Sequence, residues 1–311
     1  MNHLRFFVLL AAGTIALWLS IPVTPFHGIL DASEIAVSAS TPFVIFALEI
    51  GAVGWQQCSL RRMIFHLDRS QRTDLILFSV HITGLMSFLT IVFSFGLTCI
   101  FAEMGQATLE YAAGFSICLD AGNFLVNFLI YFALSSFIEY WSHRLFHTGF
   151  FWHLHRLHHS ASSLNPLVMH RAHPANLVFD PLVRTLPIAL VAIPGPAIYM
   201  LFVANTLFQL LIHSSIPWNW GWFGRWILIS PAAHRIHHSA NPAHYGKNFS
   251  TSLVIWDRLF GSWYAGKVQV ESVGVSGCDG QNLLIDCARD LATFVREAVT
   301  AFRLRLVSQH R

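Results

Sequence analysis

Long apolar stretches dominate the first half of the chain. Four of them approach or exceed the length that a helix needs to cross a bilayer core of about 30 Å. The longest carries no formal charge, whereas the weakest has Glu49 in its middle. These candidate transmembrane segments are residues 6–22, 42–57, 75–101 and 121–141. The pattern predicts an integral membrane protein with about four helical spans.

The first apolar stretch can also be interpreted as a signal peptide, because a short segment containing Arg5 precedes it. No small-x-small cleavage site follows the apolar run at the expected distance. We therefore interpret residues 6–22 as a retained helix.

The charges in the loops predict an orientation. Four arginines lie between the second and third candidate spans, whereas loops 23–41 and 102–120 contain acidic residues and neither Lys nor Arg. The arginines are Arg61, Arg62, Arg69 and Arg72. By the positive-inside rule, the N-terminus is then cytosolic and the chain after residue 141 emerges on the cytosolic face.

The second half of the chain contains one further apolar region, residues 182–212. Pro187 and the run Pro194-Gly195-Pro196 interrupt it, which favours a hairpin that dips into the membrane over two full crossings. After residue 266 we expect a polar loop and then an amphipathic helix over 281–307. The predicted fold is all-α, a membrane bundle with a cytosolic histidine-rich cap. Its regions are an N-terminal transmembrane part (1–120), a histidine-rich domain (121–265) and a C-terminal part (266–311).

The composition agrees with this prediction and excludes other classes. Hydrophobic residues make up 54% and charged residues only 11% of the 311 positions, and the mean hydropathy is +0.54. A net charge of +3 gives no basic surface for nucleic acid. The five cysteines form no C-x-x-C pair, so metal chemistry in this chain must depend on histidine.

Histidines are concentrated in one third of the chain. Of the 18 histidines, 13 lie between positions 143 and 244, and eight of them form three boxes. The boxes are His143 and His147; His155, His158 and His159; and His234, His237 and His238. Spacings of three and four residues on a helix allow each box to aim its rings at one point. Imidazole suits iron, zinc, copper or nickel, and eight ligands imply two metal ions. A pH-sensing cluster is the alternative use of many histidines, but it does not need this repeated spacing.

Together the boxes HRLFH, HRLHH and HRIHH resemble those of the fatty acid hydroxylase and sterol desaturase superfamily, integral-membrane di-iron enzymes. The resemblance covers roughly residues 125–265 and includes HRAHP at 170–174 and the run SPAAHRIHHSANPAHYGKNFS from position 230. It implies two further ligands, His173 and His213. Many relatives have Asp where Glu139 stands, four residues before His143, and we expect Glu139 to accept the second N–H of that ligand.

One departure from the family pattern concerns the end of this region. The family often shows Asp-x-Asn-Tyr-Gly, whereas this chain has Gly246-Lys247-Asn248-Phe249-Ser250. Asn248 is retained and is expected to support the ligands, but the acidic partner is missing. Asp257 and Arg258 are interpreted as a structural ion pair or helix cap.

The resemblance implies an O2-dependent reaction at two iron ions, with zinc as a possible occupant in purified material. The expected reaction is hydroxylation of a lipid C–H bond, and desaturation of a lipid at the same site is the alternative. Electrons must come from a separate donor of the cytochrome b5, ferredoxin or rubredoxin type, because the chain has no nucleotide-binding, haem-binding or cysteine-cluster motif. Sterol, fatty acyl, sphingoid base, ether lipid and carotenoid all stay open as substrates.

Two alternatives belong to other classes of protein. A metal transporter or metal-storage protein would also be rich in histidine, but transporters place polar groups inside their spans, whereas these boxes follow the predicted span. A non-catalytic relative would keep only the fold, and the eight intact box histidines count against it.

Overall fold

The computed structural model describes residues 32–83, 85, 120–176, 195–267, 269–275 and 282–309, and helices are the regular elements in these ranges. Within these ranges there is no strand, only isolated β-bridges that join Leu228 to Leu253 and Ser239 to Val273. The helical class expected from the sequence is confirmed. The long helices are α2 (Ala32–Val53), α4 (Arg69–Ile82), α7 (Phe124–Phe146), α10 (Gly195–Ile212) and α14 (Leu283–Gln309). The short ones are α3 (Ser59–Phe65), η1 (Gly149–Phe151), α8 (Trp152–His159), η2 (Pro166–His170), α11 (Gly221–Trp226), α12 (Pro231–His237), η3 (Pro242–His244) and α13 (Ile255–Leu259).

Helix α7 corresponds to the predicted segment 121–141. Within the described ranges it is the one helix long and apolar enough to cross a membrane, judged by length and composition. It is capped at its N-terminus by Asn123, whose side chain accepts hydrogen bonds from the backbone N–H groups of Leu125 and Val126. The helix continues past the predicted end to Phe146. His143 therefore lies in the last turn of α7 itself, and not in a separate segment that follows the span.

Other predicted apolar segments are only partly described. Segment 42–57 falls mostly within α2, where the buried Glu49 carboxylate accepts hydrogen bonds at 2.7 Å from both the backbone N–H and the hydroxyl of Ser59. Segment 75–101 begins within α4, which starts earlier, at a capping box formed by Asp68 and Gln71. Most of its remainder, segment 6–22 and residues 182–194 lie outside the described residues. The four-span topology stays a prediction.

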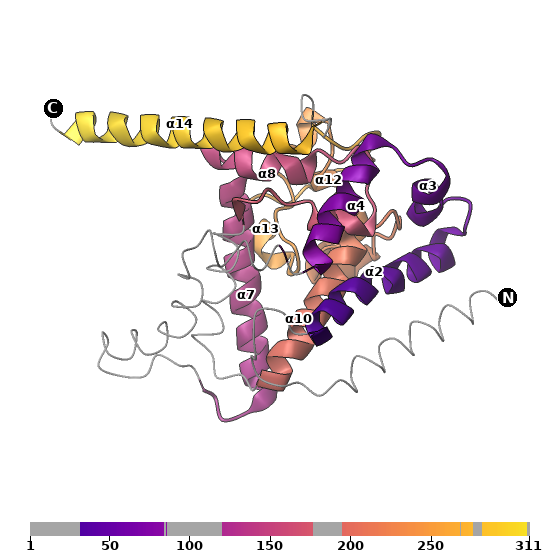
Figure 1. The fold of residues 1–311 in the computed structure, drawn as a ribbon. Coiled ribbons are helices and arrows are strands. Elements are labelled where there is room, and N and C mark those ends of the chain that lie inside the picture. Colours follow the sequence, from indigo (N-terminus) through magenta and orange to yellow (C-terminus); the bar gives the residue numbers. More distant parts are fainter. Residues whose placement is uncertain are drawn as a thin grey trace.

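The helices that carry the second and third histidine boxes pack against the long helices. Buried Ile212, Ala233 and Val254 bring together α10, α12 and the N-terminus of α13, which Val254 caps. Leu77 of α4 and Leu157 of α8 form a second cluster, against which Leu283 and Cys287 of α14 pack. Figure 1 shows α8, α12 and α14 at one end of the molecule, with α7 and α10 extending away from them. The boxes on α8 and α12 therefore meet at the end of the apolar helices.

Candidate metal centre

Nine histidines form two groups whose ring nitrogens converge. In each group the possible ligand atoms lie within 4.8 Å of one another. Group A consists of His143, His147, His155, His159 and His237. Group B consists of His158, His213, His234 and His238. Seven of the nine are buried, and His147 and His158 are partly exposed. The structure thus brings together nine of the ten histidines that the sequence predicted as ligands.

The boxes on α8 and α12 divide between the two groups. On α8, His155 and His159 belong to group A, whereas His158 belongs to group B. Consecutive residues of a helix are turned by about 100°, so neighbouring rings such as His158 and His159 point in different directions. On α12 and its C-cap, His237 joins group A, while His234 and His238 join group B. The expectation that each box aims at one point therefore holds for the first box, whose histidines both lie in group A, and is wrong for the second and third boxes. Helices α8 and α12 connect the two groups.

The hydrogen bonds of the Nδ1 atoms determine whether the Nε2 atoms, which face the other rings of the group, carry a proton or a lone pair. His143 Nδ1 lies 2.7 Å from the carbonyl oxygen of Phe249, and His237 Nδ1 lies 2.9 Å from that of Lys247. A carbonyl oxygen can only accept, so both Nδ1 atoms carry the proton of a neutral ring. Their Nε2 atoms are 3.0 Å apart and present lone pairs to each other.

Group B repeats this arrangement. His213 Nδ1 donates to the carbonyl oxygen of Gln209 at 2.7 Å, and the backbone of Arg171 hydrogen-bonds the ring of His158. The Nε2 atoms of His213 and His158 then face each other at 3.2 Å. Facing lone pairs repel unless a cation lies beside both nitrogens, so this geometry favours metal binding over mutual hydrogen bonding.

The spacing of the rings fits metal coordination. Two nitrogens each about 2.1 Å from one ion are about 3.0 Å apart at a right angle and about 3.4 Å apart at a tetrahedral angle. The Nε2 contacts within the groups measure 3.0 to 3.2 Å. In group A, moreover, the buried Nε2 atoms of His147 and His159 have no hydrogen-bond partner among the residues that the structure describes. The residues present fit two ions that accept imidazole ligands, such as iron or zinc.

Burial keeps the rings neutral. It is the main cause that lowers the pKa of His158, His159, His234, His237 and His238 well below the ordinary value of 6.5, and the neighbouring rings add to this shift. Burial likewise lowers the pKa of His213 to about 4. Neutral imidazoles are the form that binds metal, so at neutral pH the site needs to release few protons when metal enters.

We expect acid to destabilise the metal-free protein. Since these pKa values are depressed in the folded state, the unfolded chain binds more protons once the pH falls through about 6.5, and the free energy of unfolding decreases. The melting temperature of chelator-treated protein should therefore decline between about pH 7 and about pH 5. A melting temperature that is constant over this range would contradict neutral, buried rings.

The structure differs from two sequence predictions, that His173 is a metal ligand and that Glu139 accepts the second N–H of His143. His173 lies outside both groups: its Nε2 donates to the carbonyl of Cys287 at 2.9 Å and its Nδ1 accepts from Ala175. Glu139 accepts from the hydroxyl of Thr251 at 3.0 Å. The carbonyl of Phe249, not Glu139, accepts the second N–H of His143 because that backbone segment passes the end of α7.

Asn248 supports the group A histidines through the backbone. Its φ of 55° is in the left-handed region, which Asn tolerates better than most residues. Its buried side chain donates to the carbonyl of Ala233 on α12 and accepts from the N–H of Tyr264, both at 2.9 Å. Residues 246–250, which we call the carbonyl loop, are thereby held so that Lys247 and Phe249, on either side of Asn248, accept from two group A histidines.

Asp257 holds the same loop from the other side. Its buried carboxylate accepts from the backbone N–H groups of Phe249 at 2.8 Å and Ser250 at 3.0 Å, and from the hydroxyl of Ser262 at 2.7 Å. Of the two roles expected for Asp257 and Arg258, an ion pair or a helix cap, the ion pair is wrong, because the Arg258 guanidinium donates to a backbone carbonyl and stacks 3.5 Å from the ring centre of Trp226.

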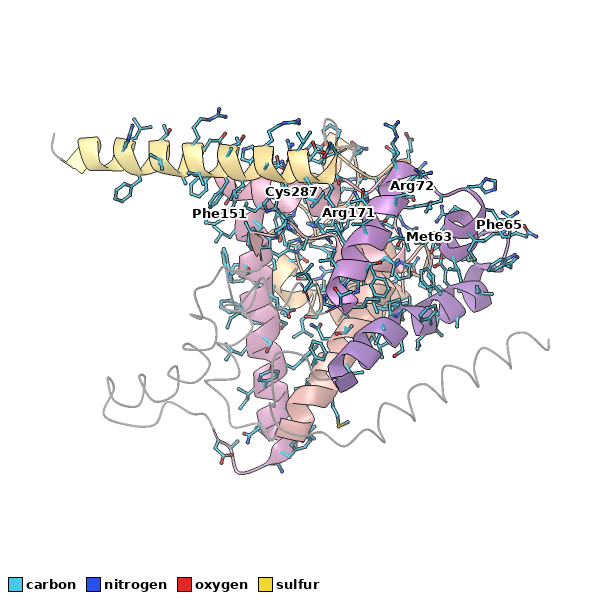
Figure 2. All side chains as sticks on the ribbon, in the orientation of Figure 1. Met63, Phe65, Arg72, Phe151, Arg171 and Cys287 are labelled. Atoms are coloured by element: carbon cyan, nitrogen blue, oxygen red, sulfur yellow. The ribbon has the colours of Figure 1, made fainter. Side chains whose placement is uncertain are left out.

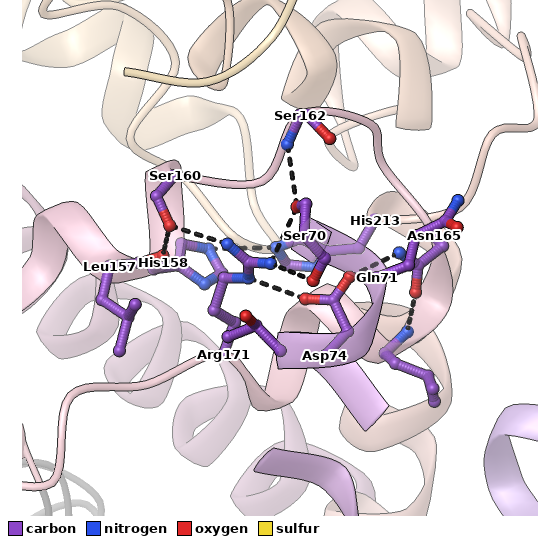
Figure 3. A network of polar contacts seen from close by, with 12 residues as sticks. Ser70, Gln71, Asp74, Leu157, His158, Ser160, Ser162, Asn165, Arg171 and His213 are labelled. Atoms are coloured by element: carbon purple, nitrogen blue, oxygen red, sulfur yellow. Dashed lines mark hydrogen bonds and ion pairs between the residues drawn. The ribbon is translucent and has the colours of Figure 1, made fainter. Parts of the chain in front are cut away.

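A buried ion pair that the sequence analysis missed lies beside group B. Arg171 and Asp74 are fully buried, with Arg171 Nε 2.7 Å from Asp74 Oδ1. Figure 3 shows the guanidinium next to the His158 ring, bonded to Asp74, Ser160 and Ser70. The sequence did contain a signal for this pair, because Asp74 directly precedes a long apolar run. A carboxylate at such a position is costly to bury without a partner.

Comparisons with known proteins identify the region that contains these groups. Residues 128–262 match the family model described as fatty acid hydroxylase. All nine histidines of groups A and B lie within this range. No solved structure matches the chain.

Curated relatives include lipid-modifying enzymes. The chain is 34% identical over 138 residues to the alkylglycerol monooxygenase of Xenopus tropicalis, and the match covers 42% of this chain and 29% of that protein. It is 26% identical over 200 residues to an ornithine lipid hydroxylase of Rhizobium tropici, and that match covers 64% of this chain and 60% of the hydroxylase. A very-long-chain aldehyde decarbonylase of Oryza sativa is 31% identical over 139 residues, covering 43% and 50%. The chain thus spans less than two thirds of these relatives' own length.

Proposed function

Because this chain belongs to the fatty acid hydroxylase family through residues 128–262, we propose that it is a membrane-bound di-iron enzyme that uses O2 to hydroxylate a lipid. The observation that carries the proposal is the pair of adjacent histidine groups whose Nε2 lone pairs converge. The names of two relatives, a monooxygenase of alkylglycerol and a hydroxylase of ornithine lipid, support a lipid substrate.

Each part of the site has a physical role in this proposal. Two irons would supply activation of O2 and removal of hydrogen from an unactivated C–H bond. Groups A and B would hold them, and the carbonyl oxygens of Lys247, Phe249 and Gln209 fix the ring orientations by accepting from Nδ1. The burial of most of the rings keeps water from the reaction. A separate electron donor on the cytosolic side completes the proposal.

Metal analysis tests the two-ion site directly. Protein purified without oxygen is expected to contain two transition-metal ions per chain. His159→Ala removes a group A ligand and His234→Ala a group B ligand, and each should lower the content toward one, because each group holds its own ion. His173→Ala is the matched control, since His173 lies outside both groups. Less than one metal per chain in the wild type, or equal loss in all three variants, would contradict the proposal.

Product analysis distinguishes hydroxylation from desaturation. Lipids extracted from cells with and without the gene are compared by mass spectrometry. Hydroxylation adds one oxygen atom to a lipid, whereas desaturation removes two hydrogen atoms. A gene-dependent lipid with one added oxygen is the expected result, and its absence from cells that carry His159→Ala would attribute it to the site.

A further inference from the structure

Helix α14 is attached to the histidine-bearing helix α8 along one side. Asp290 pairs with Arg156 of α8 at 2.8 Å, and Glu297 lies 3.3 Å from the ring of His153. The ring of Phe294 lies 5.7 Å from that of Phe151 in η1. Figure 2 shows Cys287 and Phe151 where α14 meets the helices beneath it. This side of α14 is therefore occupied by the protein.

A second side of α14 carries an exposed apolar stripe. Leu284, Leu291, Val295 and Phe302 are 81%, 42%, 50% and 63% exposed. At about 100° per residue these four positions fall within a sector of about 40°, about 100° away from the side that contacts α8. The stripe runs most of the length of the helix, and it is too large and too regular to be scattered surface residues.

A third side carries a row of arginines. Arg289, Arg296 and Arg303 are exposed and spaced seven residues apart, so they lie on one line about 120° from the apolar stripe. Helices that lie in the membrane interface combine an apolar side with a basic polar side in this way. The arginines would then meet anionic headgroups, each attraction contributing about 1 kcal/mol near the surface.

The position of α14 relative to α7 favours a lipid surface. In Figure 1, α14 crosses the end of α7 and extends beyond it toward the C-terminus. If α7 crosses the bilayer, α14 runs along the membrane surface. At the same end of α7, Trp141 is 41% exposed and lies under the guanidinium of Arg144, a combination typical of membrane interfaces.

The acidic residues of α14 disfavour a second copy of the chain as the partner. Asp290 and Glu297 contact Arg156 and His153, and Asp286 lies 3.4 Å from Arg289 on the same helix. The described residues of α14 therefore offer no unpaired acidic row to an arginine row of a neighbouring copy. An anionic lipid surface supplies the complementary charge.

We propose that α14 is an in-plane membrane helix, with the apolar stripe in an anionic leaflet and the arginine row at the headgroups. Because Asp290 and Glu297 of α14 contact α8, α14 holds α8, and with it the second histidine box, at the level of the membrane interface. The proposal depends on α7 crossing the membrane and not on the identity of the reaction.

Photo-crosslinking tests which surface meets the stripe. A benzoylphenylalanine replaces Phe302, or Arg296 as the matched control, in the full chain in nanodiscs that contain phosphatidylglycerol. Lipid adducts at position 302 should exceed those at position 296 by about five-fold or more, because only the stripe enters the acyl region. Equal yields at the two positions, no lipid adduct at 302, or a crosslink from 302 to a second copy would overturn the proposal.

The lipid headgroup is tested in the same system. In neutral phosphatidylcholine nanodiscs the adduct yield at position 302 should fall by about two-fold or more, because the arginine row loses its anionic partners. An equal yield in both lipids would overturn the role assigned to the arginines. Both substituted positions are exposed, and an unchanged metal content in each variant verifies that the fold is intact.

Discussion

Replacing Asp74 with alanine is expected to destabilise the protein by about 3–5 kcal/mol, because it leaves the fully buried guanidinium of Arg171 without its countercharge. The same guanidinium donates to Ser160 and Ser70, and the backbone of Arg171 hydrogen-bonds His158. The loss should lower the melting temperature of the purified protein by on the order of 10 °C. Group B should lose metal more readily than group A.

Asp68→Ala is a matched control on the same helix. Asp68 caps the N-terminus of α4 by accepting from the N–H of Gln71 at 2.7 Å, and its loss is expected to cost about 1 kcal/mol. Removing both buried charges with Asp74→Leu and Arg171→Met should recover much of the stability, because no unpaired charge is left. A melting temperature for Asp74→Ala that equals that of Asp68→Ala would show that the ion pair does not support the fold.

The sequence predicted which histidines lie close together because helical spacing is visible in the residue order. It could not predict how they divide between groups A and B. The second and third boxes share the pattern H-x-x-H-H, yet the first and last histidines of the second box join group A, whereas those of the third box join group B. The opposite assignment arises because α8 and α12 approach the site from different directions, and this depends on packing that no local pattern records.

The supporting contacts were the least predictable part of the site. Glu139 was expected to orient His143 because it lies one helical turn away, but the acceptor is the backbone carbonyl of Phe249, far along the chain. Every residue carries a carbonyl group, so nothing in the sequence marks the one that will face a ligand. Asn248 could be found from the sequence because it matches the family pattern Asp-x-Asn-Tyr-Gly. In the structure it stabilises the conformation of the carbonyl loop.

Apolar length predicted the helices better than it predicted their ends. The stretch 121–141 corresponds to α7, but capping by Asn123 sets its start, and the amphiphilic turn with Ser142 and His143 extends it. At α4 the polar residues Gln71, Thr73 and Asp74 are buried in the helix ahead of the predicted start, because Arg171 and Asn165 bond to Asp74. Tertiary partners therefore decide which polar residues a buried helix contains.

Asp257→Ala is expected to weaken metal binding at group A by about 10- to 100-fold. The substitution removes the acceptor of two backbone N–H groups, those of Phe249 and Ser250, and each buried donor left unpaired costs about 1–3 kcal/mol. The carbonyl loop should then shift, and the carbonyl oxygens of Lys247 and Phe249 should no longer hold the rings of His237 and His143. We would measure the metal content of the variant at increasing chelator concentrations. One ion should be lost at a low concentration, and the second ion, in group B, should be retained.

Glu139→Gln is the control that separates this role from a general effect of removing a carboxylate. Glu139 accepts from the hydroxyl of Thr251, next to the carbonyl loop, whereas the Nδ1 atoms of His143 and His237 donate to backbone carbonyl oxygens of that loop. Its substitution should leave both ions bound at the chelator concentration that removes the first ion from Asp257→Ala. If Asp257→Ala instead loses both ions together with its cooperative thermal transition, Asp257 supports the whole fold. Selective loss from group A is the result that assigns it to the carbonyl loop, because only His143 and His237 depend on that loop for their Nδ1 acceptors.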